Sequence, residues 1–164
     1  MGTDGESGSE RVERLLREAR SAAVLVRLDA SARTAAEAAA AIGCAVEQIA
    51  KSLIFKGAQS GAAILAIASG SIRVDEAKIA QAAGEPIAKA DARFVREQTG
   101  YAIGGVAPIG HLRPPKAIFL DIGLSRLDPL WAAAGHPHIV FRSTYAELAR
   151  LTQGRTIEMA GEMG

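Results

Sequence analysis

The stretch Thr99-Gly100-Tyr101-Ala102-Ile103-Gly104-Gly105-Val106-Ala107-Pro108-Ile109-Gly110 is the part of the sequence on which the interpretation of the fold depends. Glycine permits positive φ and close approach of another group to the main chain, whereas proline fixes φ and lacks an N–H donor. The apolar residues between them are not expected in an exposed linker. The pattern therefore predicts a shaped, partly buried loop whose backbone faces another group. A glycine-rich turn between two strands is the alternative that composition leaves open.

Size and composition describe a single domain with little net charge. The 164 residues are enough to bury a core within one domain. Because 19 Lys and Arg residues are balanced by 18 Asp and Glu residues, no long-range field attracts the chain to DNA or to an anionic membrane. The aromatic content of 4% offers few faces on which bases could stack. Any contact with a polynucleotide is therefore expected to be local and small.

The sequence indicates a cytoplasmic protein. The single cysteine, Cys44, cannot form an internal disulfide, which suits a reducing compartment. No apolar run approaches the roughly 20 residues that span a bilayer, and the charged N-terminus lacks the apolar core of a signal peptide. We therefore expect no membrane contact.

Hydrophobic periodicity and capping residues predict a mixed α/β fold. We expect residues 1–9 to be a disordered tail and residues 10–164 to form the domain. Helices are predicted over residues 10–23, 34–43, 46–50, 75–84, 91–100 and 144–151. Strands are predicted over residues 24–28, 52–55, 62–68, 117–122, 130–134, 139–142 and 156–159, with 62–68 apolar enough to be buried on both faces. Because the two kinds of element do not alternate regularly, we expect a strongly bent mixed sheet with helices packed around it.

Familiar catalytic and metal-binding motifs are missing. The sequence contains no G-x-S-x-G, H-E-x-x-H or C-x-x-C, and its glycine-rich stretch fits neither the dinucleotide-binding fingerprint nor the P-loop. The i, i+2 spacing of His136 and His138 would place both on one face of a strand, but Pro137 between them favours a turn. Without a third ligand in view, we expect no metal and no other cofactor.

Lys51 is the most informative single residue. It stands at the junction of a predicted helix and the apolar run Ser52–Phe55, where a lysine is costly unless its ammonium has a partner such as an anionic ligand. The alternative is that Lys51 satisfies the last helix carbonyls with its head in water. Asp121 poses the same choice between an acid of the site and a strand-end residue that reaches solvent. Cys44 and Trp131 are interpreted as packing residues, with a nucleophile as the alternative for Cys44 and a pocket-lining side chain as the alternative for Trp131.

Several ordered segments resemble the YbaK-like family, the free-standing relatives of the editing domain inserted in bacterial prolyl-tRNA synthetases. The resemblance runs from Thr34 to the C-terminal strand and is carried by Gln48-Ile49-Ala50-Lys51-Ser52-Leu53-Ile54-Phe55, Arg73-Val74-Asp75, Thr99 to Pro108, and Ala133-Ala134-Gly135. The lysine before an apolar strand and the G-x-x-x-P loop, here Gly104 to Pro108, are the functional marks of that family. The resemblance implies a barrel-like form of the bent sheet.

The resemblance also implies an aminoacyl-tRNA deacylase that acts in trans. Such an enzyme hydrolyses the ester of a small amino acid misattached to tRNA, most often tRNA for proline. A synthetase pocket cannot strongly exclude smaller amino acids, because a missing methylene is worth only about 1–3 kcal/mol of discrimination. The expected partners are the acceptor end of mischarged tRNA and a synthetase. Two other functions stay open: a non-catalytic module that binds the acceptor end or a synthetase, and a hydrolase of small esters.

The site that the resemblance implies joins Lys51 to the glycine-rich loop. Lys51 and Gly104 are the expected catalytic residues: the loop backbone would orient the ester and a water, and Lys51 would hold the terminal phosphate or ribose. Substrate contacts are expected from Gly105, Val106, Ala107, Pro108, Ser69, Gly70, Asp121, Ala134, Gly135 and His136. The last three residues are expected near the pocket for the amino-acid side chain, where His136 either contacts the substrate or caps its turn.

Overall fold

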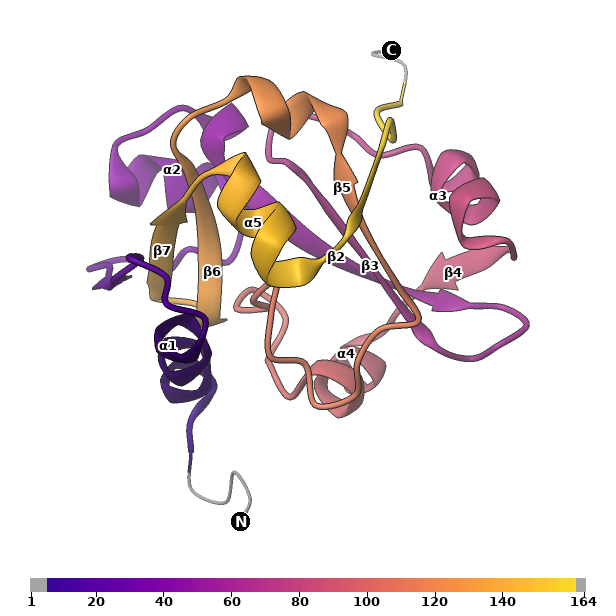
Figure 1. The fold of residues 1–164 in the computed structure, drawn as a ribbon, viewed down its shortest axis with the longest axis horizontal. Helices are drawn as coiled ribbons and strands as arrows, with labels where there is room; N and C mark the ends of the chain where they lie inside the picture. The colour runs from indigo at the N-terminus through magenta and orange to yellow at the C-terminus, as the bar shows by residue number, and fades with distance from the viewer. Residues whose placement is uncertain (1–5, 162–164) are drawn as a thin grey trace.

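The computed structural model describes residues 6–161 and confirms the mixed α/β class (Figure 1). Its helices are α1 (Gly8–Glu18), α2 (Ala35–Ile42), α3 (Glu76–Ala83), α4 (Ala92–Thr99) and α5 (Tyr145–Thr152), with the 3₁₀ turns η1 (Val46–Gln48) and η2 (Ile122–Arg126). Its strands are β1 (Leu25–Arg27), β2 (Ala50–Gly57), β3 (Ala63–Ser69), β4 (Ile87–Lys89), β5 (Ala117–Asp121), β6 (Leu130–His136), β7 (Ile139–Ser143) and β8 (Arg155–Ile157). No helix in this part of the chain is long and apolar enough to cross a membrane.

The strands are divided between two sheets. The smaller sheet is antiparallel with the order β1-β7-β6, and the larger has the order β4-β2-β3-β5-β8. In the larger sheet, β2 pairs antiparallel with β3 and β4, whereas β5 pairs parallel with β3 and β8. A parallel bridge between Ile49 and Trp131 joins β6 to the start of β2. This bridge links the two sheets two residues before Lys51.

Local capping signals set the ends of the helices, as predicted. Thr34, Asp75, Asp91 and Thr144 each accept a main-chain N–H of the first turn of α2, α3, α4 and α5, respectively. These bonds satisfy donors that have no partner inside the helix. Glycines 43, 84 and 100 end α2, α3 and α4 in the left-handed conformation, which costs glycine little.

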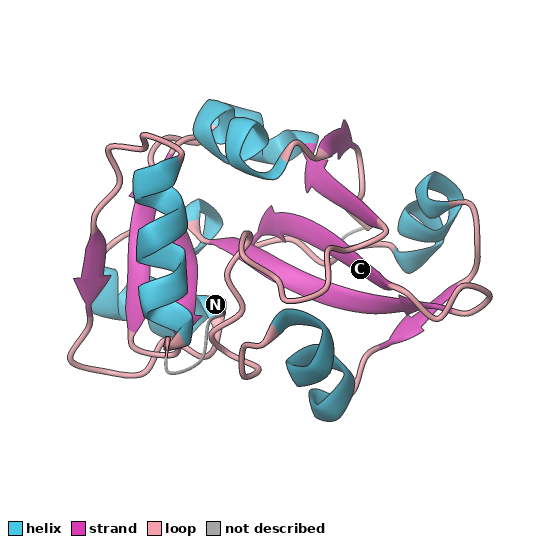
Figure 2. Cartoon of the chain, turned by 60° about the horizontal axis from the view of Figure 1, so that its bottom comes forward, coloured by secondary structure: helices cyan, strands magenta, loops and turns pink. Residues whose placement is uncertain are grey.

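Helix α1 begins earlier than expected. The Ser7 side chain accepts the N–H of Glu10, and the Glu10 side chain accepts the N–H of Ser7, so the two form a capping box. The prediction of a disordered tail was therefore wrong for residues 7–9, whereas residues 1–5 of that tail lie outside the described part of the chain. The helix covers one face of the smaller sheet (Figure 2) and contacts β6.

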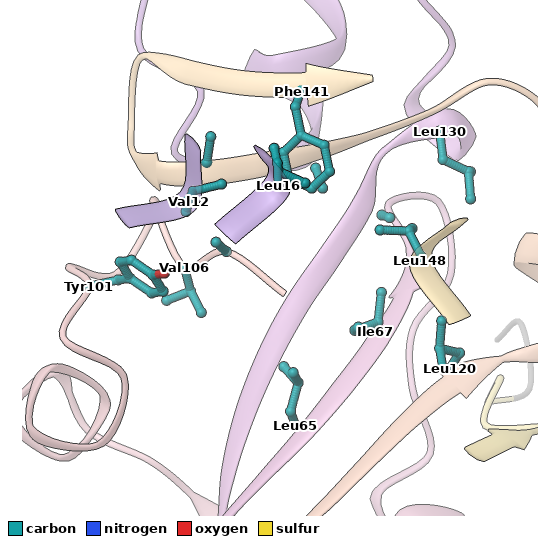
Figure 3. Close-up of a cluster of buried hydrophobic side chains, with 14 of the residues drawn as sticks. Val12, Leu16, Leu65, Ile67, Tyr101, Val106, Leu120, Leu130, Phe141 and Leu148 are labelled. Carbon is teal, nitrogen blue, oxygen red and sulfur yellow. The ribbon is translucent and has the colours of Figure 1, made fainter. Parts of the chain in front are cut away.

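Two apolar cores lie on opposite faces of β3, as its uninterrupted apolar sequence predicts. Leu65 and Ile67 face the larger core, which fills the space between the two sheets, α1 and α5 (Figure 3). Ile64 and Ala66 face the second core under α3. Every residue of β3 is buried. Because β3 is buried and pairs with β2 along its whole length, it fixes the position of β2.

Two strand predictions needed correction. The strand expected at Ser52–Phe55 extends from Ala50 to Gly57, so Lys51 is its second residue rather than the end of a helix. The short strand β4 was not predicted, because only four residues lie between Pro86 and the next helix cap, Asp91.

Candidate functional site

A pocket of about 350 Å³ opens along the edge of β2. Six consecutive residues, Ile49 to Ile54, line it. Because successive side chains of a strand point to opposite faces, a pocket touched by all of them follows the edge of the strand. The other lining residues come from α2 and the segment before it, the end of β4, α4, the glycine-rich loop, β6 and β7: Ala32, Arg33, Thr34, Ala35, Ala38, Ala90, Val95, Ile103, Gly104, Val106, Trp131, Ala132, Ala133 and Val140.

Lys51 lines this pocket with its ammonium already anchored. Its Nζ donates to the main-chain oxygen of Ile72 at 2.7 Å. The side chain is half-buried, and burial lowers the pKa of its ammonium below the usual value. Ile72 follows β3, so the proposed role of capping helix carbonyls is wrong. The anchor leaves the remaining ammonium donors for other acceptors, because an ammonium carries three.

Gly104 is the glycine of the loop that reaches the pocket. Its φ is +95°, and a Cβ added there would come within 2.9 Å of the Cγ of Arg33. The next residue is committed to the loop itself, because the N–H of Gly105 donates to the oxygen of Ala102 at 3.0 Å. The N–H of Gly105 is therefore not available to a ligand. The loop connects α4 to β5, so it is not the turn between two strands that composition allowed.

The loop is shaped by contacts from within. The Tyr101 hydroxyl donates to the oxygen of Ile109 at 2.8 Å, and the His111 Nε2–H donates to the oxygen of Ala107 at 2.7 Å. Burial lowers the pKa of His111, which favours the neutral ring that this bond uses. Ala107 and Pro108 are buried behind the pocket, whereas Val106 lines it. The predicted partly buried loop is thus present in the structure.

The pocket is apolar with two cations. Within the described part of the chain, its ionisable lining side chains are those of Arg33 and Lys51, and most other lining residues are aliphatic. The same part of the chain holds no group of three His, Cys, Asp or Glu side chains arranged to bind a metal ion. Such a lining suits a ligand with an anionic end and a small apolar group.

Three predicted substrate-binding residues have structural roles away from this pocket. The buried Ser69 hydroxyl donates to the oxygen of Glu47 at 2.8 Å, and Gly70 packs so closely under α2 that an added Cβ would lie 2.6 Å from the Cβ of Ala35. The Asp121 carboxylate accepts the N–H of Gly123 at 3.0 Å and that of Met159 at 2.8 Å. The strand-end acid is therefore a buried cap rather than a residue of the pocket or the surface.

Ala134, Gly135 and His136 support the loop from behind instead of lining the pocket. The Ala134 side chain is buried in the larger core, and Gly135 contacts the start of α1. The exposed His136 ring accepts the N–H of His138 at 3.0 Å, which is the turn-capping alternative. A Cβ on Gly105 would lie 2.9 Å from the His136 backbone. The turn and the loop are thus in direct contact.

Sequence reasoning missed several residues of the pocket. Arg33 and Thr34 line it at the start of α2. From the sequence, Thr34 was assigned only as the cap of that helix. Trp131 packs beside residues of α2 and also forms part of the pocket wall, so both roles considered for it are present. Ser52 immediately follows Lys51 and lines the pocket. Its hydroxyl, an unusual polar group in an apolar strand, was the available signal.

Comparison with known proteins places this arrangement in a family. Residues 29–151 match the aminoacyl-tRNA editing domain. The chain belongs to that family. This editing domain is 33% identical over 128 residues to the uncharacterized protein YwhH of Bacillus subtilis (strain 168), covering 78% of this chain and 80% of YwhH.

Solved structures share the fold of this editing domain. A protein described as a candidate trans-editing enzyme for prolyl-tRNA synthetase is 40% identical, with a TM-score of 0.87 over 94% of this chain and 98% of that one. The hypothetical protein APE2540 is 27% identical, with a TM-score of 0.85 over 93% of this chain and 100% of that one. The fold and the YbaK-like resemblance expected from the sequence are therefore confirmed.

Proposed function

We propose that this editing domain is an aminoacyl-tRNA deacylase that acts in trans on the acceptor end of mischarged tRNA in the cytoplasm. The observation that carries the proposal is that Lys51 and Gly104 line the same pocket. Family membership supplies the substrate class, and the likeness to a candidate trans-editing enzyme for prolyl-tRNA synthetase favours tRNA for proline. A synthetase that hands over its mischarged product would be the partner.

The pocket offers different surroundings for the two ends of an aminoacyl ester. The aliphatic wall formed by Val95, Val106 and Val140 suits a small amino-acid side chain. Arg33 and the free donors of Lys51 suit the ribose and phosphate of the terminal nucleotide. The carbonyl carbon would then lie near Gly104, because the loop belongs to both regions: Gly104 lies close to the Arg33 side chain, and Val106 is part of the aliphatic wall.

The reaction is hydrolysis of an ester. Water adds to the acyl carbon, the bond to the ribose oxygen breaks, and that oxygen leaves with a proton as the tRNA hydroxyl. Main-chain donors beside Gly104 would stabilise the charge that develops on the carbonyl oxygen. No carboxylate or histidine of residues 6–161 lines the pocket, so the proton is passed between the water and the neighbouring ribose hydroxyl. Lys51 orients that hydroxyl.

A panel of mischarged tRNAs tests this function. Purified protein is incubated with tRNA for proline carrying alanine, cysteine, 2-aminobutyrate, serine or threonine, and the loss of ester is followed with time. We expect hydrolysis of at least one substrate above the spontaneous rate. If every ester in the panel stays intact while the protein still binds the acceptor end, the protein is a non-catalytic binding module. Equal hydrolysis of free amino-acid esters would instead indicate a small-ester hydrolase.

A further inference from the structure

The edge of β2 is open at one place, and that place lies in the pocket. Pairing of β2 with β4 ends at Phe55 and Lys89, and the bridge between Ile49 and Trp131 closes the other end. Within the described chain, no strand pairs with this edge at Ser52. The gap is one that a short extended group could fill, because an unpaired edge presents N–H and C=O groups.

The pairing with β3 shows which main-chain groups face this gap. The Gly57 N–H donates to Ala62 at 2.9 Å, and the Gly70 N–H donates to Ile49 at 2.7 Å. Residues 49 and 57 therefore direct their main-chain groups toward β3. Because the direction alternates along an antiparallel strand, Ser52 directs both its N–H and its C=O away from β3 and into the gap.

The side chain of Ser52 indicates a polar ligand at the same point. Its Oγ is buried and has no hydrogen-bond partner within residues 6–161. Buried polar groups almost always have a partner, and an exception in a pocket marks a position where a ligand can supply one. Ser52 pairs with Ile67 of β3, which faces the larger core. The hydroxyl thus lies on the face of the sheet that carries the aliphatic wall.

The charges of the pocket restrict what can bind there. Arg33 and Lys51 repel an ammonium group. An amine that enters the pocket therefore needs neutral acceptors, and the Ser52 carbonyl and hydroxyl provide them.

We propose that the aminoacyl group binds to the β2 edge as a single added strand residue opposite Ser52, an inference that rests on the proposed deacylase function. The amine and carbonyl of an aminoacyl ester flank one carbon, as do the N–H and C=O of a residue in a strand. The amine donates to the Ser52 carbonyl and Oγ, and the ester carbonyl accepts the Ser52 N–H. Ser52 is thus a residue that recognises the amino-acid portion of the substrate.

Paired substrates test the amine contact. Alanyl-tRNA is compared with propionyl-tRNA, which lacks the amine, each rate being divided by the spontaneous rate at the same pH. The wild type should accelerate alanyl-tRNA hydrolysis about 100-fold more than propionyl-tRNA hydrolysis, because the amine makes two hydrogen bonds that are each worth about tenfold. Ser52→Ala should lose about tenfold on alanyl-tRNA and nothing on propionyl-tRNA. Ser31→Ala is the matched control, because the Ser31 Oγ is also buried without a partner in residues 6–161 but does not line the pocket.

A proline substitution tests the main-chain contact. Ser52→Pro removes an N–H that no neighbouring strand uses, and proline is tolerated at such edge positions. The variant should fold and lose about 100-fold in deacylation of both substrates. If Ser52→Pro does not fold, the substrate comparison decides alone.

The two proposals fail in different ways. A wild type that hydrolyses no aminoacyl-tRNA overturns the deacylase function and this inference with it. A wild type that accelerates both substrates equally, with Ser52→Ala as active as the wild type, overturns only the role of Ser52.

Discussion

Replacing Gly104 with alanine tests whether the glycine-rich loop takes part in catalysis. Its effect on kcat/KM can be separated from the stability that is lost through backbone strain. At φ +95° an L-residue other than glycine costs about 1–2 kcal/mol. For a chain of this length that free energy lowers the thermal midpoint by about 2–8 °C. The new Cβ would also approach the Cγ of Arg33 to 2.9 Å. The flexible Arg33 side chain can move away, but the loop must shift with it.

Gly84→Ala is the matched control for this substitution. Gly84 has a φ of +81°, and nothing lies within 4 Å of an added Cβ. It ends α3 and does not line the pocket. Both variants should therefore lose similar stability from the backbone strain alone.

The kcat/KM for deacylation should differ between the two variants. Since the loop positions main-chain donors at the reacting carbonyl, its displacement in Gly104→Ala should lower kcat/KM about 100-fold or more. Gly84→Ala should keep the wild-type value at 25 °C. The assay is single-turnover hydrolysis of a mischarged tRNA, with thermal unfolding measured on the same preparations. Equal stability loss in both variants with unchanged kcat/KM in Gly104→Ala would refute a role of the loop in catalysis.

The remaining predictions concern three side chains whose roles the structure separates. Lys51→Met keeps the apolar stem but removes the ammonium, so the deacylation rate should fall at least about 100-fold with little change in thermal midpoint. Lys56 is exposed on the same strand, and Lys56→Met should leave both the rate and the thermal midpoint unchanged. Asp121→Asn should lower the free energy of unfolding, measured with denaturant, by about 1–3 kcal/mol, because one buried N–H loses its acceptor. The kcat should not change. A lower kcat without a loss of stability would show that Asp121 acts in the site. His111 has a pKa lowered by burial, so the unfolded state binds its proton first as the pH falls below the ordinary value, and the free energy of unfolding should decrease from pH 7 to 5.5. In His111→Gln this component of the pH dependence should disappear, and an unchanged pH profile would contradict the assignment of a neutral ring.

Local chemistry made much of the fold predictable. The caps at Thr34, Asp75, Asp91 and Thr144 are each read from residues within one helical turn, and each is present in the structure. The apolar run of β3 is likewise a local signal for burial on both faces. Strand β4 escaped prediction because three residues beside Pro86 carry no periodicity.

The pocket was only partly predictable because its residues meet through tertiary structure. Lys51 and Gly104 could be singled out from their own segments, but Arg33 reaches the pocket only because α2 packs beside β6. Gly135 has a φ of +86° in the irregular end of β6, and its neighbours Ala134 and His136 do not line the pocket. The role of Asp121 depends on the N–H of Met159, which lies 38 residues later. No pattern local to either residue reports that contact.

The most direct measurement is a crystal structure of the protein with a non-hydrolysable amide analogue of alanyl-adenosine. We predict that the acyl carbonyl lies between the β2 edge and Gly104, with the ribose next to Lys51. An analogue bound elsewhere, such as the separate pocket beside Val24 and Pro129, with the Lys51–Gly104 pocket empty, would contradict the proposed site.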